Sequence, residues 1–91
     1  PEQYVLLPIS EKFNDYAQSV QAALEDADIA GQVDLRDEKI GRKIRDAEIR
    51  KVPYMLIVGE KEVEEGKVSI RKKYEGDQGA LDVATFIAQF K

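Results

Sequence analysis

The sequence predicts a layered α/β domain in which the first part of the sheet is parallel and the later strands are antiparallel or mixed. Two short apolar segments, 4–9 and 52–59, are typical of buried strands. Apolar residues at helical spacings separate them, and a polar–apolar alternation follows the second one. The expected order is strand, helix, strand, helix, strand, strand and helix, which predicts an α/β fold. The chain of 91 residues has the size of one domain, residues 1–91.

The first strand is expected in the apolar run from Tyr4 to Ile9, which Pro8 and Ser10 end. Ser10 can cap the helix that follows, because its hydroxyl can accept a backbone hydrogen bond in the first turn. The apolar residues of that helix recur at spacings of three and four, as expected for a face that packs on a sheet. They are Phe13, Tyr16, Ala17, Val20, Leu24 and Ala27.

A second strand is expected at Gln32–Arg36, after a break at Ala30–Gly31. Polar and apolar residues alternate in it, so Val33 and Leu35 are expected to share one covered face. A second helix is expected from about Asp37 to Lys51. Its apolar stripe consists of Ile40, Ile44 and Ala47.

Two residues of this second helix do not follow from its amphipathic pattern. Gly41 lies in the first turn, where glycine is less favourable than alanine by about 1 kcal/mol. It therefore indicates close packing or the close approach of a partner. Ile49 falls nearly opposite the apolar stripe, and amphipathicity alone does not explain it.

The most apolar segment, Val52–Gly59, is expected to form a central strand covered on both faces, with Pro53 at its start. A charged connection at Glu60–Gly66 has room for one helical turn. The next strand, Lys67–Lys73, alternates cleanly. Its inward side chains are Val68 and Ile70, and its outward side chains are Ser69, Arg71 and Lys73.

The end of the chain predicts a turn, a short strand and a helix. The turn is expected at Glu75–Gly79 and a short edge strand near Ala80–Leu81. Asp82 can cap the last helix. The buried face expected for that helix is Val83, Phe86, Ile87 and Phe90.

Composition excludes much catalytic chemistry within these residues. The chain has no Cys, which excludes disulfides and zinc–thiolate sites, and no His, which removes the usual general base. Its glycines fit neither a P-loop nor a dinucleotide fingerprint. The pair Glu64–Glu65 can in principle bind a divalent metal, but Lys61 and Lys67 beside it favour a solvated turn.

The absence of a signal peptide and of any long apolar run favours a soluble, cytoplasmic protein without a membrane partner. The chain starts at Pro1 without an initiator methionine and runs directly into a predicted strand. This start suggests a piece excised from a longer polypeptide.

The net charge of −4 argues against a nucleic-acid binder, but its distribution argues for one. Residues 1–35 contain one Lys against seven acids, and residues 52–91 contain six basic residues against seven acids. Residues 36–51 contain seven Lys and Arg against four acids. A local basic stripe can hold a phosphate backbone even in an acidic domain. The alternative is a solvated helix face of mixed charge.

Once these catalytic functions are set aside, the remaining function is that of a binding surface. Arg and Lys position phosphates and can donate to the acceptor edge of guanine. Glu62 is suited to accept hydrogen bonds from a base, and single-stranded RNA loops present bases in this way. Tyr74 is a candidate for stacking on a base, whereas Tyr54 in the central strand is expected in the core. The cations that can converge on one side of the sheet are Arg36, Lys39, Arg42, Lys43, Arg45, Arg71 and Lys73.

At these residues the sequence resembles the C-terminal anticodon-binding domain of threonyl-tRNA synthetase, in the class II aminoacyl-tRNA synthetase family. The resemblance covers essentially the whole chain in order. Its most specific parts are D-x-R-x-E-K-I-G-x-K-I-R at 34–45 and V-P-Y-M-L at 52–56. The segment K-E-V-E-x-G-K-V-x-I-R at 61–71 looks particularly threonyl.

The resemblance implies a three-layer α/β/α fold with a mixed five-stranded sheet that grips the anticodon stem-loop of tRNA-Thr. It implies that Glu62 and Arg71 read the guanine in the middle of the anticodon, and that Arg45 and Asp37 lie near the uracil that follows. The family often has Asn where this chain has Asp37, which cannot donate a hydrogen bond when ionised. A simple helix cap is the alternative for that residue. The implied phosphate-holding residues are Arg36, Lys39 and Lys43.

The resemblance also implies that the parent enzyme is a threonine-tRNA ligase, with ATP and zinc held in a catalytic domain outside this chain. The expected partners are the tRNA-Thr anticodon loop and the rest of the synthetase, a homodimer. The chain alone is expected to be non-catalytic and to hold no cofactor. Two other classes stay open: an accessory protein-interaction module of the same fold that no longer reads an anticodon, and a small α/β enzyme acting on a metabolite.

Overall fold

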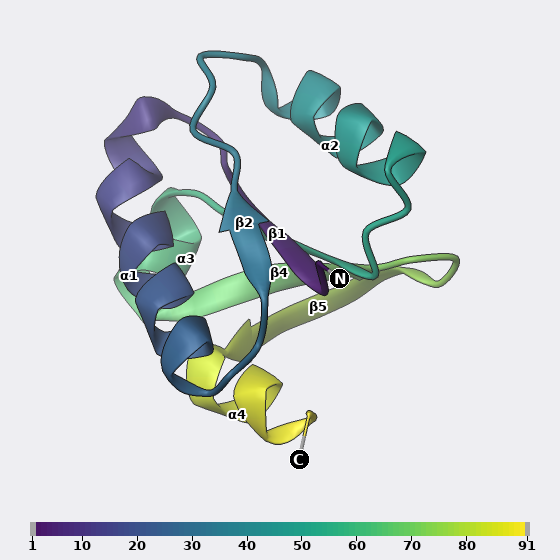
Figure 1. Ribbon diagram of the computed structural model, residues 1–91. Coiled ribbons are helices and arrows are strands. Elements are labelled where there is room, and N and C mark those ends of the chain that lie inside the picture. The colour runs from purple at the N-terminus through teal and green to yellow at the C-terminus, as the bar shows by residue number, and fades with distance from the viewer. Residues whose placement is uncertain (1, 91) are drawn as a thin grey trace.

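The structure is a computed structural model that describes residues 2–90. Its strands form one mixed sheet in the order β2-β1-β3-β4-β5 (Figure 1). β1 pairs in parallel with β2 and β3, whereas β4 pairs antiparallel with β3 and β5. The predicted mixed five-stranded sheet is therefore confirmed, with β3 at its centre. The strands are β1 (Tyr4–Pro8), β2 (Gly31–Val33), β3 (Tyr54–Val58), β4 (Lys67–Lys72) and β5 (Gly76–Asp82).

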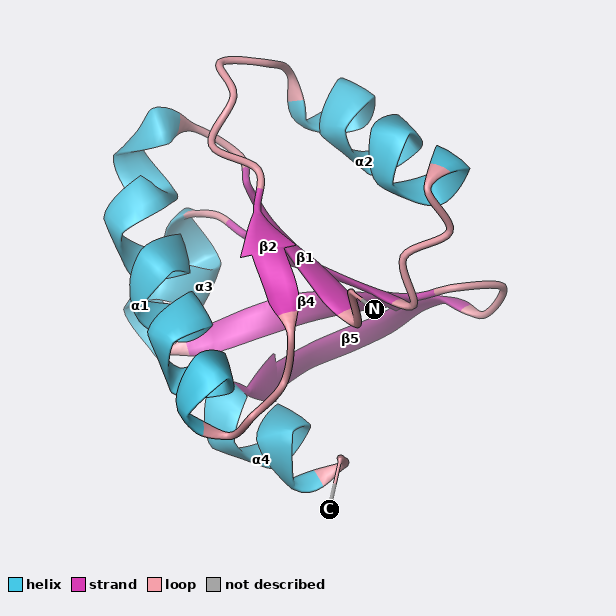
Figure 2. Ribbon diagram, in the orientation of Figure 1, coloured by secondary structure: helices cyan, strands magenta, loops and turns pink. Residues whose placement is uncertain are grey.

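Helices cover both faces of the sheet, which confirms the three-layer α/β/α arrangement (Figure 2). On one face pack α1 (Asn14–Asp26) and α4 (Val83–Ala88), and on the other packs α2 (Ile40–Ile49). A short 3-10 turn, η1 (Glu11–Phe13), leads into α1. Between β3 and β4 the charged connection forms a six-residue helix, α3 (Glu60–Glu65).

The two faces of the sheet bury separate sets of apolar side chains. Alternate residues of β1 point to opposite faces, so Tyr4 and Leu6 pack with α1 and α4, while Val5 and Leu7 pack with α2. All five residues of β1 are buried, as is typical of a parallel strand covered on both sides. The stripe predicted for the second helix is confirmed, because its three members pack in the α2 core; they are Ile40, Ile44 and Ala47.

Tyr54 contributes to the core, as its place in the central strand predicts. Its ring packs edge-on against Phe86 and Phe90, with centroid distances of 5.3 and 5.6 Å. Edge-to-face pairs of this kind add about 0.5–1.5 kcal/mol beyond the burial of their surface. The predicted inner face of the last helix packs in the same core, and it consists of Val83, Phe86, Ile87 and Phe90.

The second strand ends at Val33 instead of continuing to Arg36 as predicted. The backbone N–H of Asp34 still donates to the carbonyl of Leu6 at 2.9 Å, and its carboxylate accepts the backbone N–H of Arg36 at 3.2 Å. An aspartate that bonds the backbone two residues on forms a turn and diverts the chain from the sheet. Leu35 is consequently 44% exposed rather than covered beside Val33.

The second helix begins at Ile40 instead of near Asp37. The backbone N–H of Glu38 donates to the carbonyl of Arg36 at 2.9 Å, so the chain makes a further turn before the helix starts. Lys39 occupies the N-cap position, and its side chain makes no capping hydrogen bond. Asp37 therefore does not cap this helix, which removes the alternative role that the sequence left open for it.

The last strand is much longer than the short edge strand predicted near Ala80–Leu81. The chain reverses at residues 73–75 rather than at the predicted turn 75–79. Gly76 and Gly79 lie in β5 with φ values of 75° and 83°, and the pairing with β4 shifts register between them. Glycines at positive φ are typical of a β-bulge as well as of a turn, so the local signal was ambiguous.

The two predicted caps stand at helix starts but differ in their bonding. The hydroxyl of Ser10 accepts the backbone N–H of Lys12 at 3.3 Å, so it caps η1 ahead of α1. Asp82 occupies the N-cap position of α4, and its side chain makes no capping hydrogen bond.

Candidate nucleic-acid interface

The site residues predicted from the sequence fall in two places, apart from Arg45 on the outer surface of α2. The first is a pocket of about 580 Å³ beside the carboxyl ends of β1 and β2. The crevice outside the carboxyl ends of the strands is where open α/β sheets usually bind ligands. This pocket gathers the three predicted phosphate holders with Asp37 and two exposed apolar residues; the six are Ile9, Leu35, Arg36, Asp37, Lys39 and Lys43.

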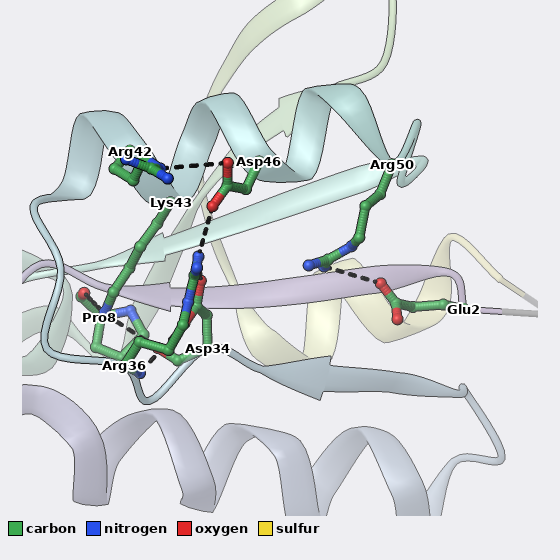
Figure 3. A network of polar contacts seen from close by, with 8 residues as sticks. All are labelled: Glu2, Pro8, Asp34, Arg36, Arg42, Lys43, Asp46 and Arg50. Carbon is green, nitrogen blue, oxygen red and sulfur yellow. Dashed lines mark hydrogen bonds and ion pairs between the residues drawn. The ribbon is translucent and has the colours of Figure 1, made fainter.

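Arg36 is held at this pocket by two carboxylates (Figure 3). Its Nε and Nη2 donate to Asp34 at 2.9 and 2.8 Å, and Nη2 also donates to Asp46 of α2 at 3.0 Å. The hydrogen bond from Arg36 holds the pKa of Asp34 below its usual value. The same carboxylates raise the pKa of Arg36 above its ordinary value. Arg36 is thus oriented at the pocket, with part of its charge already balanced.

Lys43 is buried, in contrast to the phosphate-holding role that the resemblance implies. Only 3% of the residue is exposed, and its Nζ donates to the backbone carbonyls of Pro8 at 3.1 Å and Asp34 at 3.0 Å (Figure 3). These carbonyls lie at the ends of β1 and just after β2, so Lys43 ties the two chain segments together. A buried ammonium needs such acceptors because it has lost its water. The geometry assigns Lys43 a structural role.

Lys39 and Asp37 are exposed at the rim of the same pocket. Neither makes an ion pair within residues 2–90. Lys39 stands at the N-cap of α2, beside backbone N–H groups that have no partner within the helix and favour negative charge. A phosphate there meets both a free ammonium and the positive end of a helix.

The second place is the face of β4 that points toward the α2 side of the sheet. Val68 and Ile70 point into the opposite core, so Ser69 and Arg71 lie on this face. The Glu62 carboxylate reaches it from α3: Oε2 accepts from the Ser69 hydroxyl at 2.8 Å, and Oε1 accepts from the Gly59 N–H at 2.8 Å. The predicted guanine readers, Glu62 and Arg71, are therefore brought to the same face.

Arg45 lies on the exposed outer surface of α2. It precedes Glu48 by three residues, so the two share a flank of the helix. Glu48 lines a second pocket, of about 370 Å³, together with Arg71 of β4. The other flank of α2 is engaged in ion pairs with the β1–β2 side, where Asp46 binds Arg36 and Arg50 binds Glu2. Arg45 is thus on the flank that leads toward Arg71, without touching either pocket described here.

Gly41 is exposed on the first turn of α2, and a Cβ placed there meets no atom within 4 Å. Packing within residues 2–90 therefore does not require glycine at this position. Of the two explanations that the sequence left open, the approach of a partner is the one that the geometry favours. Gly41 and Arg45 are four residues apart and share one helix face.

Three residues that shape these places were given no role from the sequence: Asp34, Asp46 and Ser69. Local signals existed for the first two. Asp34 stands two residues before Arg36, which is an aspartate-turn spacing, and Asp46 stands four residues after Arg42, with which it pairs at 3.6 Å. Ser69 has no such signal, because its hydrogen bond to Glu62 joins a strand to a separate helix.

Residues 2–90 lack the features of two other functional classes. Those residues contain no group of three or more His, Cys, Asp or Glu side chains arranged to hold a metal ion. None of their helices has the length and apolar character needed to cross a membrane.

The profile of the family described as "Anticodon binding domain" matches residues 3–91. The chain therefore belongs to the anticodon binding domain family, whose members form a class of tRNA-binding domains. Two relatives within that class are threonine–tRNA ligases. The chain is 58% identical over 88 residues to the threonine–tRNA ligase of Parabacteroides distasonis, covering 97% of this chain and 14% of that protein. It is also 58% identical over 91 residues to that of Cytophaga hutchinsonii, covering 100% of this chain and 14% of that protein.

A solved structure matches the fold closely. The crystal structure of the RNA binding domain of threonyl-tRNA synthetase from Cryptosporidium parvum Iowa II superposes with a TM-score of 0.93 at 32% identity. The match covers 99% of this chain and 23% of that one. The predicted resemblance to threonyl-tRNA synthetase and the predicted fold are both confirmed. The chain spans about 14% of the length of the curated relatives named above.

Proposed function

We propose that this chain binds the anticodon stem-loop of tRNA-Thr and reads its anticodon bases on behalf of a threonine–tRNA ligase. Family membership supports tRNA binding, and the relatives support the assignment to threonine. One observation supports base reading: the Glu62 carboxylate bonds the Ser69 hydroxyl, and Ser69 shares the α2-side face of β4 with Arg71. A carboxylate acceptor and a guanidinium donor complement the donors and acceptors on the edge of guanine.

The uracil that follows the guanine is assigned to Arg45 and Asp37. An ionised Asp37 accepts the N3–H of uracil and cannot donate to its carbonyl oxygens. Arg45, exposed on the flank of α2, supplies the donor that an asparagine at position 37 would provide.

The phosphate backbone is assigned to Lys39 and Arg36. Lys39 is the stronger candidate, because it is exposed and makes no ion pair within the described residues. Arg36 contributes less charge, since Asp34 and Asp46 already bind it. Lys43 is left out of this set because its ammonium is buried against two carbonyls.

The parent protein is proposed to be a cytoplasmic homodimer that joins threonine to tRNA-Thr with ATP. The relatives named threonine–tRNA ligase support the activity. The ATP and zinc of that reaction are assigned to residues outside this chain. The chain itself contributes selectivity among tRNAs rather than chemistry.

An accessory protein-interaction module of the same fold is the competing function. Such a module has no need for a carboxylate and a guanidinium on the same face of one strand. Glu62 and Arg71 are both present in that arrangement, which favours the reading of bases.

Substitution of Arg71 tests the assignment. Arg71→Ala is expected to reduce the preference for guanine at the middle anticodon position by about 1–3 kcal/mol, the usual value of a good bidentate base contact. Lys39→Ala is expected to weaken binding to all stem-loops alike, because phosphates carry no sequence. Fluorescence anisotropy titrations with stem-loops that carry GGU or a changed middle base measure both effects.

Lys72→Ala is the matched control. Lys72 neighbours Arg71 on β4, but its Nζ lies on the opposite face, 3.2 Å from Glu75 and 5.9 Å from the centroid of the Tyr54 ring. Because Lys72 also lines the second pocket, the control concerns base preference alone, and its replacement is expected to leave the preference for guanine unchanged. Equal losses on every anticodon for Arg71→Ala and Lys39→Ala would contradict the assignment of Arg71 to a base.

A further inference from the structure

Tyr74 is the most exposed large apolar side chain among the described residues, at 87% exposure. It stands at the tip of the β4–β5 hairpin, in the turn at residues 73–75. Its backbone φ is 71°, a left-handed conformation in which glycine and asparagine are more comfortable than a bulky residue. The fold therefore gains little from burial of this ring, and another residue would suit this backbone conformation better.

Beside Tyr74 lies the pocket of about 370 Å³ between the end of α2 and the hairpin. Two buried apolar side chains, Val52 and Met55, contribute to its lining. Arg71, the proposed guanine reader, also lines it. The pocket thus joins an apolar surface, an exposed aromatic ring and part of the proposed base-reading site.

The charge around the pocket is mostly positive. Lys51, Arg71 and Lys73 line it and make no ion pair within residues 2–90, whereas Glu48 is its one acid. The Nζ of Lys73 lies 5.2 Å from the centroid of the Tyr74 ring, close enough for a cation–π contact. A cation over one face leaves the other face of the ring free to stack. Flat, apolar surface with a cationic rim complements a nucleobase on its phosphate backbone.

We propose that this pocket receives one unpaired base of the bound RNA loop, stacked on Tyr74 and next to the base that Arg71 reads. This inference rests on the proposed function and extends it, because it adds a stacking subsite to the base-reading face. Stacking on an aromatic ring tolerates any base, since every base has a π face. Tyr74 therefore adds affinity for a single-stranded loop without choosing its sequence.

Two substitutions in the full 91-residue chain separate stacking from folding. Tyr74→Asn removes the ring and suits the positive φ, so stability is expected to hold or rise. Its affinity for the GGU stem-loop is expected to fall about 5- to 150-fold, as loss of 1–3 kcal/mol of stacking implies. The preference for guanine at the middle position is expected to remain. Ile49→Ala removes a residue that is 68% exposed and lies outside the pocket, so it is expected to cost less affinity than Tyr74→Asn.

Tyr74→Trp supplies a direct signal, because the chain has no other tryptophan. The variant is expected to bind as tightly as the wild type, and its fluorescence is expected to be quenched by the stem-loop and not by a fully paired duplex. Quenching by an acidic peptide instead of RNA would overturn the proposal, as would unchanged RNA affinity in Tyr74→Asn. Quenching without any preference at the middle base would uphold the stacking subsite and contradict base reading by Arg71, which keeps the two failures distinct.

Discussion

Two lysines that lie four residues apart in the sequence have different roles in this molecule. Lys43 is buried against the carbonyls of Pro8 and Asp34, whereas Lys39, four residues earlier, is exposed and unpaired within residues 2–90. Position 43 falls between Ile40 and Ala47 at spacings of three and four, so its place on the inner stripe was readable from the sequence. The sequence does not reveal that two backbone carbonyls near strand ends lie within hydrogen-bonding distance of this ammonium, because their position depends on tertiary packing.

Tyr4 supplies a prediction at the scale of a single hydroxyl. The residue is fully buried in the core, and its OH has no hydrogen-bond partner within residues 2–90. Burial raises the pKa of Tyr4 to about 12. An unsatisfied buried polar group costs about 1–3 kcal/mol, so Tyr4→Phe is expected to raise the free energy of unfolding by about 1 kcal/mol. Urea denaturation measures the change.

Tyr16→Phe is the matched control for that substitution. The Tyr16 hydroxyl donates to the carbonyl of Lys67 at 2.8 Å, so its removal is expected to lower the free energy of unfolding by about 1 kcal/mol. A loss of stability in Tyr4→Phe equal to that in Tyr16→Phe would show that the Tyr4 hydroxyl is bonded after all.

The ionisation of Asp34 is expected to make the stability of the fold depend on pH. Its pKa is lowered chiefly by the hydrogen bond from Arg36, so the folded state holds the carboxylate in its charged form more strongly than the unfolded chain does. The stabilisation is therefore present above about pH 4 and lost as pH falls through the folded pKa. Asp34→Asn is expected to lower stability at pH 7 by about 0.5–1 kcal/mol, the modest value of a partly exposed pair.

The difference between wild type and Asp34→Asn is expected to shrink as the pH falls from about 4 through the lowered folded pKa of Asp34, below which the wild-type carboxyl is protonated as well. Thermal or urea denaturation at several pH values measures it. A difference that stays constant down to acid pH would mean that the ionised carboxylate of Asp34 is not what stabilises the loop.

At the scale of elements, the strands and helices with strong periodicity were predicted and the irregular connections were not. β1, β3 and the inner stripe of α2 follow from runs and spacings of apolar residues. The early end of β2 depends on one aspartate side chain, and the length of β5 depends on glycines placed in a bulge. In both cases the same residues satisfy more than one local geometry, and pairing with a neighbouring strand decides between them.

The open surroundings of Gly41 on α2 predict the effect of Gly41→Ala. Nothing within 4 Å opposes a Cβ at Gly41, and alanine suits a helix better than glycine, so stability is expected to rise by about 0.5–1 kcal/mol. Affinity for the stem-loop is expected to fall, because the added methyl group holds the RNA away from the helix beside Arg45. A variant that gains stability and binds RNA as well as the wild type would show that no partner approaches this turn.

At the scale of the whole molecule, an acidic protein carries the free cations of its proposed site around one helix. The net charge is −4, yet Lys39, Arg45 and Arg71 are free of ion pairs within the described residues and lie around α2 and the α2-side face of β4. Such an arrangement favours local binding of one RNA element over general attraction to nucleic acid. The fold and family were predictable from the sequence, whereas the division of the site between a pocket beside β1 and β2 and the α2-side face of β4 required the tertiary structure.

The most direct test of anticodon reading is an NMR titration of the ¹⁵N-labelled chain with two stem-loops, one carrying GGU and one changed only at the middle base. Chemical-shift changes at Arg45, Glu62 and Arg71 that depend on the middle base are the predicted result. Changes that are the same for both stem-loops, or no changes at all, would contradict base reading and favour the protein-interaction module of the same fold.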